Sequence, residues 1–308
     1  MEPVTFRVRG ITIEGVRWPR PASKDGAAGP TVLLVHGLAG STIEWESVGT
    51  GLAQAVGADV FAVDLPGFGR TRLPRGRSSI PSHTDAVRGV LHEVGDAVLV
   101  GNSMGGVISM RVAAATATAA ATAATGPVRA LVLVDPALVM TGAGGGASPV
   151  RTAARYALAL TPVIGPAVIG TMRRRAGAEG YIANRLAGIV KDPSRVAPEV
   201  RSRLVEQAAE RSAYRESSRC YSSSARSIFT GARSSWREVS RVQVPTFVMH
   251  GVHDALVPVG LVDRLRSMRP DWHYEVVEDA GHQPHLELPE HFVASVAAWI
   301  TTHAGPRS

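Results

Sequence analysis

One serine of this chain lies in a setting typical of covalent chemistry. Residues 101–105 read GNSMG, with Ser103 at the centre, an apolar run of strand type before it and a helical pattern after it. A serine in such a G-x-S-x-G pattern sits in a strained turn between strand and helix, where only small neighbours let the chain double back. The pattern therefore predicts that Ser103 is a nucleophile and not merely a helix cap.

A serine hydroxyl is a weak nucleophile at neutral pH, so it needs a base, and the base needs an acid that orients it. Asp254 follows the apolar run at 246–251, and His282 lies in a glycine-containing loop after the last expected strand. The chain order Ser, Asp, His differs from the orders found in other serine-triad folds. We expect Ser103, His282 and Asp254 to act as nucleophile, base and acid.

Other titratable groups compete for the two supporting roles. Asp135 also ends an expected strand, so it stays open as an alternative to Asp254. His285 is the nearest rival of His282, but no glycine precedes it and it stands where the final helix is expected to begin. Two more histidines flank the turn beside Asp254 and are expected to be packing or solvent residues: His250 and His253.

Acyl transfer also needs two fixed donors for the negative oxygen of its transition state. The backbone N–H of Met104, at the start of the expected helix, is one candidate. The second is expected from the turn HGLAGS at residues 36–41, where we assign the N–H of Leu38.

The elements that must position these groups follow from apolar runs bounded by turn residues. The expected strands are Thr5–Val8, Ile11–Arg17, Thr31–His36, Val60–Asp64, Ala97–Gly101, Ala130–Asp135, Thr246–Gly251 and His273–Val277. The expected helices are Glu44–Val56, Ile80–Val94, Ser103–Ala121, Gly260–Met268 and Pro289–Thr302. Because the strands lack polar alternation, they predict an α/β fold with a doubly wound, mostly parallel sheet covered by helices on both faces.

One long insertion interrupts the alternation of strands and helices. After Asp135 a glycine-rich joint is followed by about a hundred helix-leaning residues before the sheet resumes. The sequence therefore predicts a core at residues 1–136 and 242–308 and an inserted helical cap at residues 137–241. The uncharged stretch at 156–172 is interrupted by Pro and Gly, so we expect it to line an apolar pocket and not to span a membrane. Transient contact with a lipid surface is an alternative.

The composition of the chain limits its expected partners and its expected cellular location. The chain of 308 residues has one cysteine, which excludes an intramolecular disulfide, and a net charge of +7. The basic excess lies between residues 141 and 243, with scattered aromatics and no nucleic-acid motif, so we expect a solvated arginine-rich surface and no nucleic-acid partner. Charged residues near the start, where an export signal would be apolar, favour a cytoplasmic location. The sequence indicates no oligomeric state.

The motifs together resemble the α/β-hydrolase superfamily, in its form with a helical lid. The motifs are HGLAGS (36–41), DLPGFGR (64–70), GNSMGG (101–106), HGVHDALVP (250–258) and AGHQPHLELPE (280–290). The resemblance implies a catalytic triad of Ser103, Asp254 and His282, an oxyanion hole of Leu38 and Met104, and acyl-enzyme chemistry without metal or organic cofactor. It implies no role for individual residues of the cap.

The expected reaction is the hydrolysis of carboxylic esters, and thioesters and lactones are the next candidate substrates. Relatives that cleave carbon–halogen bonds or epoxides carry aspartate at the position of Ser103. The alternative is a carbon–carbon hydrolase of the type that acts on ring-cleavage products, but the glycine–proline oxyanion loop of those enzymes is absent, and Gln283 stands where they have tryptophan. A non-catalytic ligand receptor or scaffold is an alternative of another class. The uncharged cap stretch favours a small apolar acyl or aromatic substrate.

Overall fold

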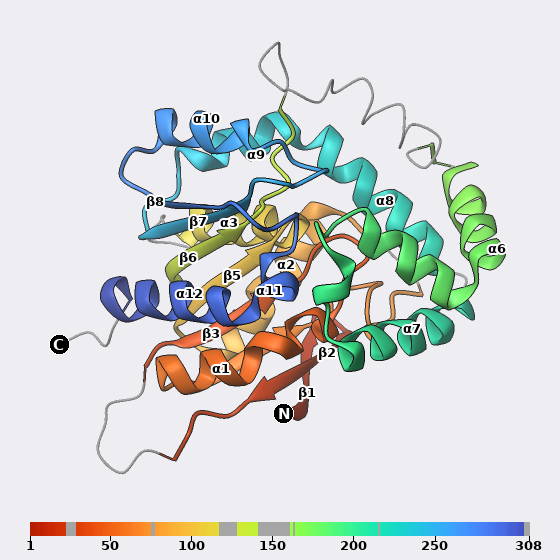
Figure 1. Ribbon diagram of the computed structural model, residues 1–308, viewed down its shortest axis with the longest axis horizontal. Coiled ribbons are helices and arrows are strands. Elements are labelled where there is room, and N and C mark those ends of the chain that lie inside the picture. Colours follow the sequence, from red (N-terminus) through yellow and green to blue (C-terminus); the bar gives the residue numbers. More distant parts are fainter. Residues whose placement is uncertain are drawn as a thin grey trace.

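The computed structural model describes residues 1–22, 29–74, 78–116, 128–140, 161–162, 164–214 and 216–304. Its centre is an eight-stranded sheet in the order β1-β2-β4-β3-β5-β6-β7-β8 (Figure 1). The strands are β1 Glu2–Val8, β2 Ile11–Trp18, β3 Thr31–Val35, β4 Val60–Val63, β5 Ala97–Asn102, β6 Val128–Val134, β7 Thr246–Gly251 and β8 His273–Val277. β1 and β2 pair antiparallel with each other, β2 pairs antiparallel with β4, and the other neighbours are parallel.

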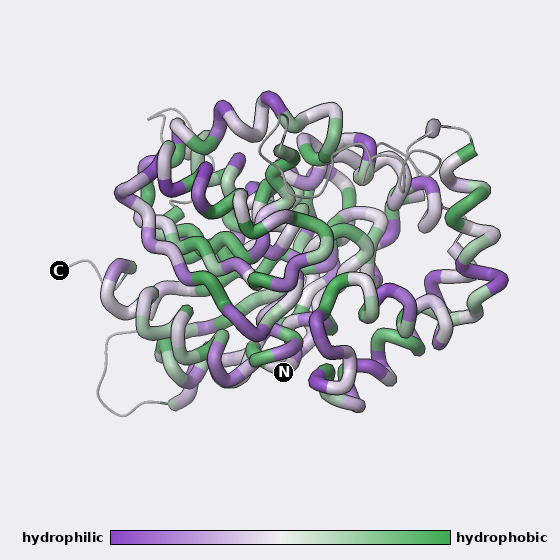
Figure 2. The backbone as a smooth tube through the Cα atoms, turned by 45° about the horizontal axis from the view of Figure 1, so that its top comes forward, coloured by the Kyte–Doolittle hydropathy of each residue, from purple (hydrophilic) through white to green (hydrophobic). Residues whose placement is uncertain are grey.

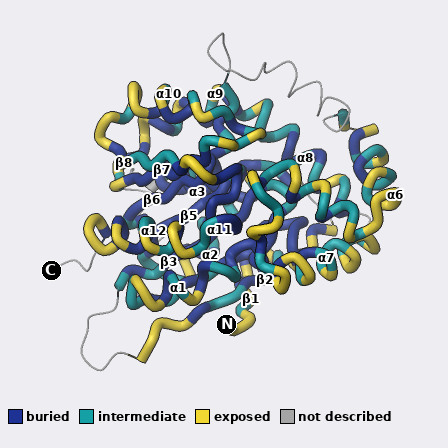
Figure 3. The backbone as a smooth tube through the Cα atoms, viewed as in Figure 1, coloured by how far each residue is buried: buried dark blue, intermediate teal, exposed yellow. Residues whose placement is uncertain are grey.

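The continuous apolar runs form strands that are buried on both faces. In β3, for example, Leu33 and Val35 belong to one core cluster, and Val32 and Leu34 belong to the cluster on the other face. The first face is covered by α2 Ile80–Val94, α3 Met104–Thr116, α9 Ala232–Val239 and α10 Gly260–Met268; the second is covered by α1 Glu46–Val56 and α12 Pro289–His303. Figure 3 shows the central strands β3, β5, β6 and β7 as the buried centre of the molecule, and Figure 2 shows hydrophobic residues concentrated in the interior. The predicted α/β fold with a mostly parallel, doubly wound sheet is confirmed.

Element boundaries differ from the prediction in a few places. The predicted helix at 44–56 begins as a short 3-10 helix, η1 Thr42–Trp45, before α1. A four-residue helix, α11 Pro284–Glu287, was not predicted and includes His285. Of the predicted helix at 103–121, residues 104–116 form α3, and residues 117–121 lie outside the described residues.

Between β6 and β7 the structure describes three further helices that project to one side of the sheet (Figure 1). They are α6 Ile164–Ala187, α7 Pro198–Ser212 and α8 Glu216–Thr230, with the short η2 Pro193–Arg195 between α6 and α7. Apolar residues of α6 and α7 pack together with Ile43 of η1 and Leu286 of α11. In contrast, α9 packs on α3 through residues such as Trp236. The division into core and cap at residue 137 stays a prediction.

Parts of the predicted cap fall outside the described residues. These parts are the glycine-rich joint at 141–149 and residues 156–160 and 163 of the uncharged stretch. Within the described ranges, no helix combines the length and the apolar character that crossing a membrane would require.

The turn from β5 into α3 is closed by two glycines. A Cβ on Gly101 would lie 2.4 Å from the carbonyl oxygen of Gly105, and a Cβ on Gly105 would lie 2.1 Å from that of Val35 in β3. Both distances are too short for any side chain. Glycine at these positions therefore lets α3 start directly against the end of the sheet.

We expect Gly105→Ala to destabilise the fold by about 1–3 kcal/mol, because the added methyl group meets backbone atoms that cannot move away. Denaturant unfolding of the variant and the parent protein measures this. Gly180→Ala is the matched control: its Cβ would meet only the Ala176 Cβ at 3.5 Å, inside α6. The control should be neutral or up to about 1 kcal/mol more stable. Equal stability of both variants would contradict the proposed steric closure.

Candidate active site

Ser103 occupies the sharp turn between β5 and α3. Its backbone has φ 55°, the left-handed region that a residue with a side chain rarely adopts. Its N–H donates to the carbonyl of Val134 at 2.9 Å, and its own carbonyl accepts from the N–H of Ala137 at 3.0 Å. These bonds to the end of β6 and the segment after it hold the serine in this conformation. The strand, serine and helix follow in the order that the sequence predicts.

His282 lies in the loop after β8, beside this turn. The side-chain amide of Asn102, the residue before Ser103, donates to the His282 carbonyl at 3.0 Å. The His282 N–H donates to the carbonyl of Ile189, which follows α6, at 2.7 Å. Nδ1 of the imidazole lies 2.6 Å from Oδ2 of Asp254. Among the described residues no hydrogen bond joins the Ser103 hydroxyl to His282, a contact that in free enzymes is often long and tightens when substrate binds.

Asp254 is held for this contact by its own loop. Its Oδ1 accepts hydrogen bonds from the N–H groups of Leu256 at 2.7 Å and Val257 at 2.9 Å, which leaves Oδ2 directed at His282. Burial acts to raise the pKa of Asp254, but the His282 imidazole and the Val257 N–H outweigh burial, so the pKa falls below its usual value. Asp254 is therefore ionised at neutral pH.

Asp135, the alternative acid, lies close to the same place without facing Nδ1. Its Oδ1 accepts from the N–H of Gly251 at 3.0 Å, and its buried Oδ2 has no hydrogen-bond partner. Burial and the charge of Asp254 raise the pKa of Asp135 well above its usual value. Asp135 therefore ionises less readily than Asp254, which carries the charge of this pair.

Asp135, Asp254 and His282 also lie close enough to be considered as metal ligands. One ligand atom from each lies within 4.8 Å of the others. The short contact between His282 Nδ1 and Asp254 Oδ2 requires a proton between these two atoms, so neither is free for a metal. The donor set fits a hydrogen-bonded pair of imidazole and carboxylate with a second carboxyl group beside it.

The other histidines near the site are placed for packing. The His285 ring stacks on Trp45 with centroids 4.2 Å apart, and burial lowers the pKa of His285 to about 3. The Nε2 of buried His250 lies 3.0 Å from the carbonyl of Val257, and burial lowers the pKa of His250 as well. His253 is exposed. None of the three lies as His282 does, with a ring nitrogen at 2.6 Å from a carboxylate.

A buried histidine fixes the loop that contains Leu38. The N–H of Leu65 donates to Nε2 of His36 at 2.9 Å, so the proton is on Nδ1, which donates to the carbonyl of Gly37 at 2.7 Å. The Gly40 N–H donates to the same carbonyl at 3.1 Å. In a trans peptide the N–H points opposite to the carbonyl, so the Leu38 N–H is turned away from His36.

Met104 supplies a second free N–H near Ser103. It is the first residue of α3, and the first N–H groups of a helix have no partner within the helix. Gly37 lies directly against Ser103, since a Cβ at Gly37 would be 3.1 Å from the Ser103 Cβ. The two predicted donors thus belong to segments that meet at the serine.

Sequence reasoning did not find the residues that join the core to α6. Glu44 in η1 is fully buried, and its carboxylate pairs with Arg185 of α6. It also accepts from Gln283 Nε2 at 3.3 Å, next to His282. Glu287 accepts from the N–H groups of Gly281 and Lys191, each at 2.7 Å. Since these partners lie far apart in the sequence, no local pattern could have paired them.

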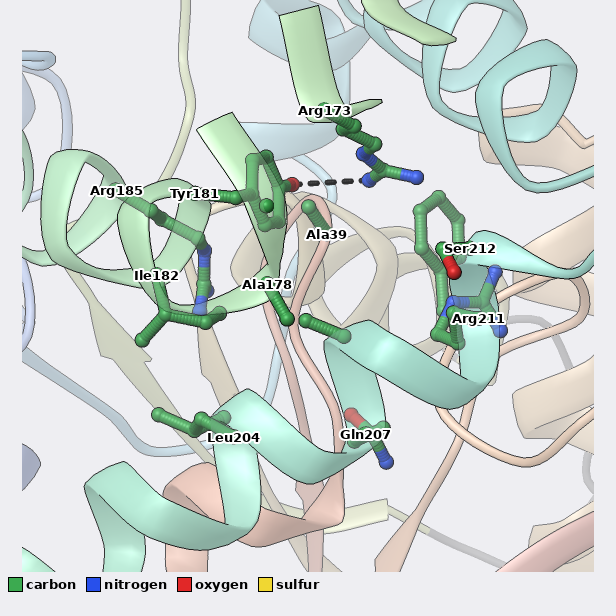
Figure 4. A pocket seen from close by; sticks show the side chains of 13 residues that line it. Ala39, Arg173, Ala178, Tyr181, Ile182, Arg185, Leu204, Gln207, Arg211 and Ser212 are labelled. Atoms are coloured by element: carbon green, nitrogen blue, oxygen red, sulfur yellow. Dashed lines mark hydrogen bonds between the residues drawn. The ribbon is translucent and has the colours of Figure 1, made fainter. Parts of the chain in front are cut away.

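A cavity of about 50 Å³ lies between the core and the helices α6 and α7 (Figure 4). Ala39, next to Leu38, lines its core side, and Arg173, Arg185 and Arg211 line its helical side. The expectation of a solvated arginine-rich surface is therefore wrong for these three arginines. No described residue of the uncharged stretch at 156–172 lines this cavity.

Comparisons with known proteins identify the family of the chain. A family model described as the alpha/beta hydrolase family matches residues 32–296. An uncharacterized protein of Mycobacterium tuberculosis is 24% identical, with 97% of this chain and 82% of that protein covered. An esterase of the same species is 32% identical over a stretch that covers 36% of this chain and 35% of that protein.

Solved structures show the same fold. The structure of a thermophilic esterase from Thermogutta terrifontis is similar with a TM-score of 0.68 at 21% identity, and the match covers 99% of this chain and 100% of that chain. The family model extends over most of the strands, the turn at Ser103 and both supporting loops. The chain belongs to the alpha/beta hydrolase family.

Proposed function

We propose that this hydrolase cleaves carboxylic esters through an acyl-enzyme intermediate, with Ser103 as nucleophile, His282 as base and Asp254 as the acid that orients it. The contact of 2.6 Å between His282 Nδ1 and the ionised Asp254 carries the proposal. It fixes the proton on Nδ1, which leaves Nε2 as the nitrogen that can accept a proton from a serine hydroxyl. The similarity of part of the chain to an esterase also supports the assignment.

In the first half of the reaction the Ser103 oxygen attacks the ester carbonyl carbon while its proton passes to His282 Nε2. The carbonyl oxygen becomes negative and accepts hydrogen bonds from the N–H groups of Leu38 and Met104. The alkoxide leaves with the proton from Nε2, and the acyl group stays on Ser103. Asp254 stabilises the imidazolium throughout by accepting from Nδ1–H.

In the second half a water molecule attacks the acyl-enzyme. His282 Nε2 takes a proton from the water and then returns it to the Ser103 oxygen as the acid product leaves. The same two N–H donors hold the second oxyanion. These steps require no group beyond the substrate, water and the residues named.

We further propose that α6, α7 and α8 form a cap over the substrate. The pairing of Glu44 with Arg185 and the bond from His282 to Ile189 support this, because they attach the helical segment to both sides of the site. The expected apolar acyl or aromatic portion of the substrate, and the alternative of transient lipid contact, stay predictions.

Ser103→Ala should lower kcat for p-nitrophenyl acetate and p-nitrophenyl butyrate by about 10⁴-fold or more, because the nucleophile is gone. Release of p-nitrophenol measures this. A fluorophosphonate probe should label the parent protein at Ser103 and leave the variant unlabelled, as mass spectrometry of peptides would show. A parent protein that neither turns over these esters nor reacts with the probe would favour a receptor or scaffold instead.

Asp254→Asn should lower kcat by about 10⁴-fold, because the imidazole loses the partner that holds its tautomer and its charge. Asp135→Asn changes a carboxyl group that has no hydrogen bond to His282 among the described residues, so the expected loss is less than about tenfold, or about 1.4 kcal/mol. Steady-state kinetics on the same ester, with circular dichroism to verify folding, compares the two variants. The reverse ranking would assign the acid role to Asp135.

A further inference from the structure

The cavity beside the oxyanion loop has an unbalanced charge. Three arginines line it, Arg173, Arg185 and Arg211, and none of the residues that line it is acidic. Arg185 is neutralised, since it pairs with the fully buried carboxylate of Glu44. The other two arginines form no salt bridge with any carboxylate in the described parts of the chain. The segment at 141–160, which lies outside those parts, contains no Asp or Glu in its sequence.

Among the described residues, Arg173 has only neutral hydrogen-bond partners, and one of its buried nitrogens has none. Its Nη1 donates to the hydroxyl of Ser217 at 2.7 Å, and its Nη2 donates to the hydroxyl of Tyr181 at 2.9 Å, the bond drawn in Figure 4. Its Nε is buried and has no hydrogen-bond partner in the part of the chain that the structure describes. A buried N–H without an acceptor is costly, and a charged group that lacks an anion is costlier still. An acceptor supplied by a ligand would remove this cost.

Arg211 also donates only to neutral groups among the described residues. Its Nη1 donates to the carbonyl of Gly69 at 2.6 Å, and its Nη2 donates to the carbonyl of Gly67 and, at 3.2 Å, to Ser217. Burial and the neighbouring charge of Arg173 lower the pKa of Arg211, and they outweigh the opposing influence of Cys220 and Asp64. The two guanidinium groups lie close together, since both donate to Ser217. Two adjacent guanidinium groups that share Ser217 favour an anion between or beside them.

The cavity also adjoins the proposed reaction centre. Ala39 lines it and directly follows Leu38, whose N–H is proposed to hold the oxyanion. A space of about 10–15 Å³ holds one water molecule, so the cavity of about 50 Å³ accommodates a group the size of a carboxylate. The planar, bidentate geometry of arginine matches a carboxylate well.

We propose that the ester substrate carries a carboxylate group and that Arg173 and Arg211 bind it in this cavity. The inference rests on the proposed esterase function and narrows the class of esters that it acts on. The expected substrates are half-esters of dicarboxylic acids, or esters of hydroxy acids, and not wholly apolar esters. Arg173 and Arg211 are then residues that determine specificity, while Glu44 and Arg185 hold the wall of the cavity.

The test compares acid esters with neutral esters of matched length. Monomethyl glutarate is paired with methyl pentanoate, and 3-acetoxypropanoate is paired with propyl acetate, so that the carboxylate lies on the acyl part in one pair and on the alcohol part in the other. A charge-assisted pair should raise kcat/KM for the acid ester of at least one pair by about 10- to 100-fold over its neutral partner. Equal values in both pairs would overturn the proposal.

Arg173→Gln should reduce this ratio towards one, mainly through KM, because the variant keeps hydrogen-bonding capacity but loses the charge. Arg174→Gln is the matched control: the adjacent residue is exposed, its Nη2 donates to Thr171, and it does not line the cavity. The control should keep the ratio. If Arg173→Gln keeps the ratio and folds like the parent protein, the arginines only attach the helices to the core and the proposal fails.

A binding measurement separates this proposal from the proposed function. Calorimetry of the Ser103→Ala protein should detect glutarate binding, and inorganic phosphate should compete with it weakly or not at all. In the double variant with Arg173→Gln, the affinity for glutarate should fall by tenfold or more. Turnover of neutral esters without glutarate binding or acid-ester preference would leave the esterase function in place and overturn the carboxylate site. Glutarate binding without any ester turnover would support the carboxylate site and overturn the esterase function. Stronger binding of phosphate than of glutarate would also overturn the carboxylate assignment.

Discussion

The loop that carries His282 depends on hydrogen bonds from three directions. The carbonyl of His282 accepts from Asn102, its N–H donates to Ile189, and its imidazole contacts Asp254. These partners belong to the β5–α3 turn, to the segment after α6 and to the loop after β7. Because hydrogen bonds are directional, few arrangements of the loop satisfy all three. The proposed chemistry relies on this loop, since it brings one ring nitrogen to the acid and leaves the other for the serine.

The two aspartates near the imidazole differ in pKa because their environments differ. Asp254 has two backbone N–H donors and the imidazole, and it keeps its charge. Asp135 has one backbone donor, full burial and a charged neighbour, and these raise its pKa well above the usual value. Two carboxylates at this distance could not both ionise in a dry interior without a large cost. The arrangement thus favours a negative charge on Asp254, the carboxylate that contacts the imidazole.

The sequence predicted the sheet and the positions of the candidate triad because both depend on local signals. Apolar runs and glycines mark the ends of strands, and Ser103, Asp254 and His282 each follow such an end. Long-range pairing leaves no such signal. The contact of Glu44 with Arg185 joins residues 141 positions apart, so it could not be read from either segment alone.

Two further features escaped prediction for related reasons. His36 orients the Gly37–Leu38 peptide. The only local signal for this role in the sequence is a histidine directly before the glycine of the loop. The burial of arginines around a cavity had none, since composition cannot distinguish an exposed arginine from one that packs against helices of its own segment. Basic composition alone therefore misassigned Arg173, Arg185 and Arg211 to the solvent.

The attachment of the helical segment at residues 189–192 limits how the molecule can admit a substrate. Ile189 accepts from the His282 N–H, and Glu287 accepts from the N–H groups of both Lys191 and Asp192. A rigid swing of the whole segment away from the sheet would break these bonds and disorganise the base. The proposed substrate would therefore have to enter by local rearrangement elsewhere in the segment, which leaves the loop of His282 in place.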